Sequence, residues 1–204
     1  MTPMPPDRRA VAVAGHTGDV GTARAGMTAA DASVRATALT ALDRLGQLAD
    51  DELVVAFADH DAVVRRRAAT LGATRPAVDL APLLADPDPT VAEAAAWAAG
   101  EQPAVTDDVI AALVELASGV GSGRDALVRE AAVAALGARG NDRGLPAVLA
   151  ATEDRPPIRR RAVLALAPFL DPDHPQAAAV AAALARAAED RDWQVRQAAE
   201  DIAP

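Results

Sequence analysis

The chain has 204 residues, a formal net charge of −9 and no cysteine. The missing cysteine excludes disulfides, thiolate metal sites and a cysteine nucleophile. The three histidines, His16, His60 and His174, are too scattered for a histidine zinc site at short spacing, so no metal or other cofactor is expected. The acidic balance opposes binding to nucleic acid or to an anionic membrane, because phosphate contacts need a positive surface.

The N-terminal residues lack the apolar stretch of a secretory signal, and no apolar run is long enough to span a membrane. We therefore expect a soluble, cytoplasmic protein. All 20 basic residues are arginine and more than half of the hydrophobic residues are alanine, a usage typical of a GC-rich genome such as that of an actinobacterium. A core made mainly of Ala and Leu requires close approach of backbones, which favours packed helices over a sheet.

Hydrophobic periodicity predicts helices throughout the chain and no strand. We expect residues 1–6 to be a disordered tail and residues 7–204 to form a single domain that begins with a helix at 7–14. Six pairs of helices follow. The first helix of each pair is short, and these are expected at 19–27, 50–58, 78–84, 107–117, 143–151 and 175–189. The second helix of each pair follows a β-branched anchor, and the anchors lie 27 to 37 residues apart: Val34, Val64, Val91, Val128, Ile158 and Val195.

Two charged residues recur around the anchors. An Asp stands three residues before the anchor in five of the six units, and an Arg stands one residue after it in five. The Asp is expected to cap the helix, since its carboxylate accepts N–H groups of the first turn. The Arg could pair with this Asp along the helix or reach the Asp of the neighbouring unit. We interpret these residues as a structural ladder that joins the repeats: Asp31, Arg35, Asp61, Arg65, Asp125, Arg129, Asp192 and Arg196.

Residues 31–46 follow the pattern Asp-x-x-Val-Arg-x-x-Ala-x-x-Ala-Leu-x-x-Leu-Gly almost completely, and residues 125–137 follow it well. This pattern resembles the second helix of a HEAT repeat in its short form, as in phycobilin-lyase-type repeats. The resemblance covers about residues 7–204 and departs where Ala92 replaces the Arg and Arg155 replaces the Asp. It implies an all-α fold, a right-handed α-solenoid of about six stacked antiparallel helix pairs with the second helices on the concave side. Such a fold presents surfaces and does not by itself name a function.

Helical phase predicts the residues that line the concave side. Positions two, six and nine residues after each anchor lie opposite the buried stripe. They give a shallow floor of small residues, including Gly100, Ala134 and Gly137, with Trp97 standing on it. Trp97 is expected to anchor a partner, as Trp often does in interfaces, or to fold back over the floor. The predicted partner-binding residues are Trp97, Glu93, Glu130, Arg66 and Arg160.

Three further features of the sequence concern the ends of helices, the connections between them and the end of the stack. Gly15 is predicted to end the leading helix, with Asp19 opening the next one. Residues 119–124 resemble a phosphate-binding loop but lack its Lys and a preceding strand, so we expect a long connection. Trp193 is expected to cover the end of the stack.

Three functions from different classes stay open. The first is a non-catalytic scaffold that binds a protein or peptide partner, carrying basic residues, on the concave face. The second is an enzyme similar to the HEAT-like DNA glycosylases that excise alkylated bases, with Trp97, Glu101, Arg139 and Trp193 as counterparts of their aromatic, acidic and arginine residues. The third is a tetrapyrrole lyase or chaperone, through the resemblance to phycobilin lyases. Because no acid, base and nucleophile converge in the sequence, the scaffold is favoured, with no catalytic residue.

Overall fold

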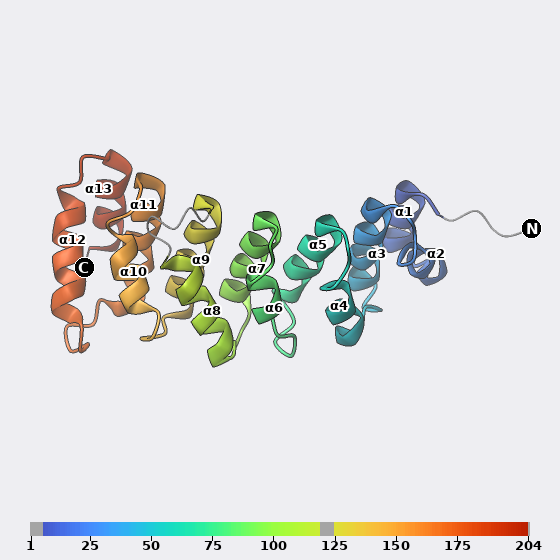
Figure 1. Cartoon of the computed structure of the whole chain (residues 1–204), viewed down its shortest axis with the longest axis horizontal. Helices are drawn as coiled ribbons and strands as arrows, with labels where there is room; N and C mark the ends of the chain where they lie inside the picture. Colours follow the sequence, from blue (N-terminus) through green and yellow to red (C-terminus); the bar gives the residue numbers. More distant parts are fainter. Residues whose placement is uncertain (1–5, 119–124, 204) are drawn as a thin grey trace, which may run out of the picture. The chain divides into compact units, whose positions relative to one another are not determined.

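A computed structural model describes residues 6–118 and 125–203. The expected tail, except Pro6, and the expected connection at 119–124 lie outside the described residues. Over the part that is described, the structure contains 13 α-helices, one short 3-10 helix and no strand (Figure 1). The predicted all-α fold is therefore confirmed. None of the helices in these two ranges is long and apolar enough to cross a membrane.

The chain divides into two compact units, the first ending at Ala98 and the second beginning at Ala99. The division falls inside α7 (Pro89–Glu101). Unit 1 also contains α1 (Arg8–Thr17), α2 (Val20–Gly26), α3 (Ala32–Arg44), α4 (Asp50–Ala56), α5 (Ala62–Gly72) and α6 (Ala81–Leu84). Unit 2 also contains α8 (Asp107–Ala117), α9 (Ala126–Arg139), α10 (Leu145–Ala151), α11 (Pro156–Ala165), η1 (Ala167–Phe169), α12 (Ala177–Ala188) and α13 (Trp193–Ile202).

Within each unit, the second helix of one repeat packs on the second helix of the next. In unit 1, α1 packs on α3 and α3 on α5; in unit 2, α9 packs on α11 and α11 on α13 (Figure 1). Helix α1 thus takes the place of a second helix. The contact surfaces are aliphatic: Leu39 and Leu42 of α3 and Val133 and Leu136 of α9 are completely buried.

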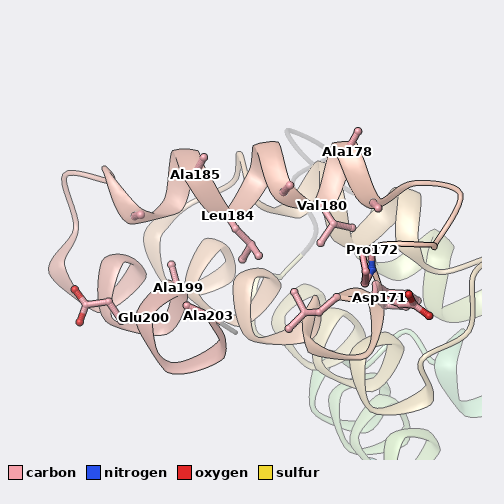
Figure 2. Close-up of a pocket in the computed structure, with 14 residues that line it drawn as sticks. Asp171, Pro172, Ala178, Val180, Leu184, Ala185, Ala199, Glu200 and Ala203 are labelled. Carbon is pink, nitrogen blue, oxygen red and sulfur yellow. The ribbon is translucent and has the colours of Figure 1, made fainter.

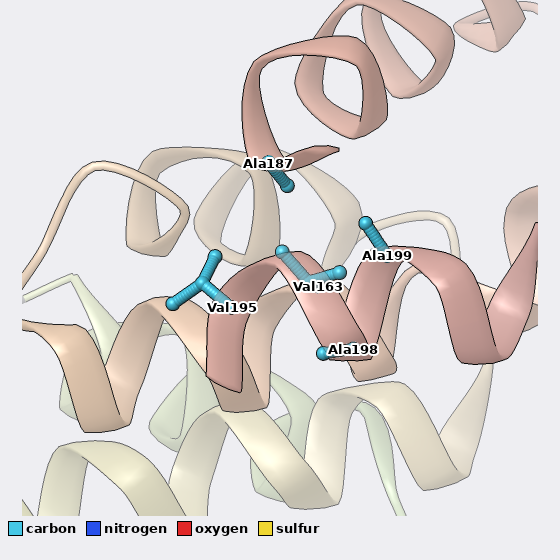
Figure 3. Packing of buried hydrophobic residues seen from close by; sticks show 5 residues of the cluster. All are labelled: Val163, Ala187, Val195, Ala198 and Ala199. Atoms are coloured by element: carbon cyan, nitrogen blue, oxygen red, sulfur yellow. The ribbon is translucent and has the colours of Figure 1, made fainter. Parts of the chain in front are cut away.

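The last repeat shows how small these core side chains are. Val163 of α11, Ala187 of α12, and Val195, Ala198 and Ala199 of α13 form one buried cluster (Figure 3). Alanine and valine fill little space, so the helices must approach closely to leave no cavity between them. In this repeat the core therefore depends on short distances between backbones more than on large side chains.

Two buried glycines mark the closest approaches between second helices. A Cβ atom added to Gly137 of α9 would lie 2.6 Å from the Cα of Ala165 in α11. One added to Gly15 would lie 2.9 Å from the Cα of Ala41 in α3. The prediction that Gly15 ends the leading helix is wrong, because this glycine serves the helix contact. Helix α1 continues to Thr17, and Gly18, with a φ of 84° that favours glycine, caps it.

Capping residues begin the second helices. The carboxylates of the predicted capping residues each accept the backbone N–H two residues further on, at 2.7 to 2.9 Å. These residues are Asp31, Asp61, Asp125 and Asp192. Helix α11 begins after Arg155 without a side-chain cap. Its first two residues, Pro156 and Pro157, have no N–H groups, so fewer donors there need an acceptor.

Replacing Asp31 by Ala should lower the free energy of unfolding by about 1 kcal/mol, the usual cost of a lost N-cap. Replacing Arg66, which is exposed on α5, should change it much less. Urea denaturation of both variants measures the difference. Equal losses would show that the Asp31 carboxylate does not contribute through capping.

Gly137→Ala should lower the free energy of unfolding by about 1 to 3 kcal/mol, because the new methyl group would overlap the backbone of α11. Gly21→Ala is the matched control, since Gly21 is exposed in α2 and a Cβ there would meet only a side-chain oxygen at 3.4 Å. It should raise stability by up to about 1 kcal/mol through helix propensity. Thermal and urea unfolding of the two variants test this difference in sign.

Candidate interaction surface

In four repeats, an arginine one residue after the anchor binds an acid of the following repeat. In unit 1, Arg35 donates from Nε and Nη2 to the two carboxylate oxygens of Asp59, at 2.8 and 2.7 Å. It also donates from Nη1 to the carbonyls of Ala29 and Ala30, both at 2.9 Å. The guanidinium thus binds the loop before its own helix and the loop of the following repeat. We call these contacts the interrepeat Arg–Asp pairs; the others are Arg65–Asp86, Arg129–Asp154 and Arg159–Asp190.

The acid in each pair is not the capping Asp. Asp59 lies two residues before the capping Asp61, and it also accepts the backbone N–H of Asp61 at 2.9 Å. Arg35 therefore reaches the neighbouring repeat rather than pairing with Asp31 on its own helix. Asp86 and Asp190 stand at the same place in their loops. This second Asp also recurs in the sequence, two residues before the capping Asp, but only the structure distinguishes it as the partner of the arginine.

Three of the paired carboxylates, those of Asp59, Asp86 and Asp190, have a pKa below the ordinary value. Hydrogen bonds from Arg35 lower the pKa of Asp59, and burial opposes this effect. The guanidinium groups of Arg65 and Arg159 likewise lower the pKa of Asp86 and of Asp190. In the last repeat, Arg196 donates to the carbonyl of Asp190 at 2.6 Å, and it forms no ion pair with an acid within the described ranges.

Unit 1 holds three of the five residues predicted to bind a partner. Trp97 exposes 48% of its surface, whereas the alanines around it in α7, Ala95 and Ala96 before it and Ala98 after it, are completely buried. Glu93 lies one helical turn before Trp97 and is half-buried. Arg66 of α5 is exposed. The Trp ring therefore extends from the solvent side of α7, beside a carboxylate.

Unit 2 holds the other two predicted residues. Glu130 of α9 is half-buried, and a carboxylate oxygen lies 3.6 Å from Nε of Arg161 in α11. Arg160 is exposed on α11.

The expected floor of small residues is wrong at the ninth position after the anchor. Gly100 and Gly137 are buried, because each faces the next second helix and not solvent. A Cβ on Gly100 would lie 3.2 Å from the Cα of Ala135, and the contact of Gly137 with Ala165 is closer still. The sixth position does reach solvent, since Ala134 is half-buried and Trp97 exposed.

The residues considered for a glycosylase do not gather within unit 2. Arg139 ends α9 and donates from Nη1 to the carbonyl of Gln102. Trp193 begins α13, and α11 packs between α9 and α13. Trp193 also exposes 64% of its surface, so it does not cover the end of the stack as expected. Glu101 is exposed at the end of α7.

In the parts of the chain that are described, no group of His, Asp and Glu side chains could hold a metal ion.

Paired helices, with second helices that stack and are joined by buried arginines, define an α-helical repeat protein. Residues 77–167 match the family model of HEAT repeats, so this part of the chain is assigned to HEAT repeats. The crystal structure of an engineered protein has the same fold. It is 19% identical, with 89% of this chain and 94% of that chain covered and a TM-score of 0.63. No curated protein matches the sequence.

The interrepeat Arg–Asp pairs should make the protein sensitive to acid. Because the pKa of Asp59 is lower in the folded state, its contribution to stability is complete above the ordinary pKa of 3.8 and is lost as the pH falls through the folded value. Asp59→Asn should cost about 3 kcal/mol at pH 7, since it leaves Arg35 buried without its acid. Below pH 4 the variant should lose less further stability than the wild type does. Urea midpoints between pH 7 and pH 2.5 measure both effects.

Asp173→Asn, which changes an exposed acid in another loop, is the control and should follow the wild-type curve. If Asp59→Asn and the wild type lose the same stability between pH 4 and pH 2.5, the pair does not govern the acid response.

Proposed function

We propose that the chain is a non-catalytic scaffold that binds a partner protein through the exposed side of α7, with Trp97 at the centre. HEAT-repeat proteins commonly act as interaction scaffolds, and residues 77–167, which match the family model, include this helix. The observation that carries the proposal is the exposure of Trp97 on a helix that is otherwise packed with alanine. A large apolar ring in solvent gains nothing for the free protein, whereas buried Trp residues often dominate the energy of an interface.

The charges around Trp97 indicate the chemistry of the partner. Glu93 lies one turn before Trp97 on the same side of α7, and the whole chain carries a net charge of −9. An apolar side chain of the partner would cover the ring, while a neighbouring Lys or Arg would pair with Glu93. The partner segment therefore carries at least one basic residue. Long-range attraction between a basic segment and the acidic chain would also speed their association.

The test is affinity capture from a lysate of the source organism with three immobilised proteins: wild type, Trp97→Ala and Trp193→Ala. Trp193 is also an exposed tryptophan and serves as the matched control. A partner that the wild type retains should be lost with Trp97→Ala and kept with Trp193→Ala. For the isolated partner, the loss should be about 2 kcal/mol of binding free energy or more. Circular dichroism should show the same helical content in all three proteins.

Two outcomes would contradict this function. Trp97 is a packing residue if Trp97→Ala lowers the melting temperature but captures the same proteins as the wild type. The chain is an enzyme if the purified protein releases bases from alkylated DNA and Glu101→Gln abolishes the release.

A further inference from the structure

Unit 2 contains an apolar groove of about 650 Å³, bounded by α12, α13 and the segment that follows α11 (Figure 2). Aliphatic and aromatic side chains line it, among them Phe169, Pro172, Val180, Leu184, Ala199 and Ala203. Its volume is within the range of pockets that bind ligands. The groove belongs to other helices than α7, so it is independent of the site proposed around Trp97.

Two residues that line the groove are charged, and both are acids. Asp171 and Glu200 are exposed, and Figure 2 shows them at opposite ends of the groove, with Leu184 and Val180 between them. A ligand that fills the groove would therefore have an apolar middle and positive charge near both ends. A fatty acid or another anionic amphiphile would instead meet a carboxylate at either end.

In the preceding repeats, the helices of one repeat are covered by the helices of the next. Helices α8 and α9 are covered by α10 and α11, and those two are covered in turn by α12 and α13. The groove runs along α12, so a helix that packs along α12 would match its length. Binding of an amphipathic helix in an apolar groove is a common mode of peptide recognition.

One residue of α13 indicates the chemistry of the occupant. The fifth position after the anchor faces the next repeat, and it is an apolar, completely buried residue in α3, α9 and α11: Leu39, Val133 and Val163. In α13 this position is Glu200, which is exposed. An apolar helix laid over Glu200 would bury an unpaired carboxylate at a cost of several kcal/mol, whereas a basic side chain would pair with it.

We propose that the groove binds an amphipathic α-helix of a partner protein, with small aliphatic residues on its inner face and Lys or Arg near both ends. Helix α12 lines the groove from Ala177 to Ala188. At 1.5 Å per residue this length is about 18 Å, so the bound helix spans about three turns. A second copy of this chain is a poorer occupant, because two chains with a net charge of −9 repel each other.

The probe is a labelled peptide that repeats the Ala, Val and Leu pattern of α12 and carries two lysines at each end. The control peptide has the same apolar residues and glutamates in place of the lysines. Fluorescence anisotropy with the full chain should show binding of the lysine peptide alone. Analytical ultracentrifugation of the chain without peptide tests whether a second copy occupies the groove instead.

Three variants locate the binding. Ala181→Arg places a large cation on an exposed position of α12 that lines the groove, and Glu200→Lys reverses the charge at one end. Each should raise the Kd of the lysine peptide about tenfold or more, which is about 1.4 kcal/mol. Asp201→Lys makes the same charge change at the next residue, which is exposed and does not line the groove. It should leave the Kd within about twofold, since exposed charges off the site are largely screened.

The proposal is overturned if the lysine peptide does not bind, or if both peptides bind equally. It is also overturned if Asp201→Lys weakens binding as much as Glu200→Lys, because attraction to the acidic chain as a whole would then explain the result. Self-association that Ala181→Arg abolishes would assign the groove to a second copy. Trp97→Ala should not alter peptide binding, so this test and the test of the Trp97 surface can fail separately.

Discussion

The stacking of repeats depends on an arginine that is buried between them. Arg129 exposes 3% of its surface, and Arg35 and Arg159 expose 8% each. A buried guanidinium is tolerated only when an acid and further acceptors surround it, and here the acid comes from the following repeat. Apolar contacts have no preferred direction, so the packed Leu, Val and Ala side chains alone fix less strictly how far neighbouring helices are shifted along each other. The interrepeat Arg–Asp pairs exclude the shifted arrangements, because these would leave the charge buried and unpaired.

One repeat lacks the arginine that forms these pairs. Of the six helices that follow an anchor, α7 alone carries an alanine, Ala92, where the others carry Arg. An alanine cannot form the pair with a following loop. The division of the chain into two compact units falls within this helix, between Ala98 and Ala99. The repeat that lacks the arginine thus also contains the division between the two units.

Periodicity in the sequence predicts the helices well, because each helix has one face buried and the period is local information. The predicted first helix at 107–117 matches α8, and the capping role of Asp31 follows from its place before an apolar stripe. The points at which two helices cross depend on residues that lie far apart in the sequence, so periodicity does not predict them. Gly15 is a plausible stop signal in the sequence, yet it allows α1 to touch Ala41, and only the position of α3 distinguishes the two roles. The groove was not foreseen either, since three separate segments form it.

Two residues differ in character from the residues at the same positions of other repeats. At the sixth position after the anchor, unit 1 has the half-buried Thr40 and Thr70, so a small polar side chain is sufficient there, yet α7 has Trp97. At the fifth position apolar residues meet the next repeat, yet α13 has Glu200. In a repeat array the neighbours decide most positions, because each repeat contacts those beside it. Packing inside the chain does not require the exposed ring of Trp97 or an acid at position 200. We propose that contacts with other molecules account for both, which is why the two proposed surfaces are centred on these residues.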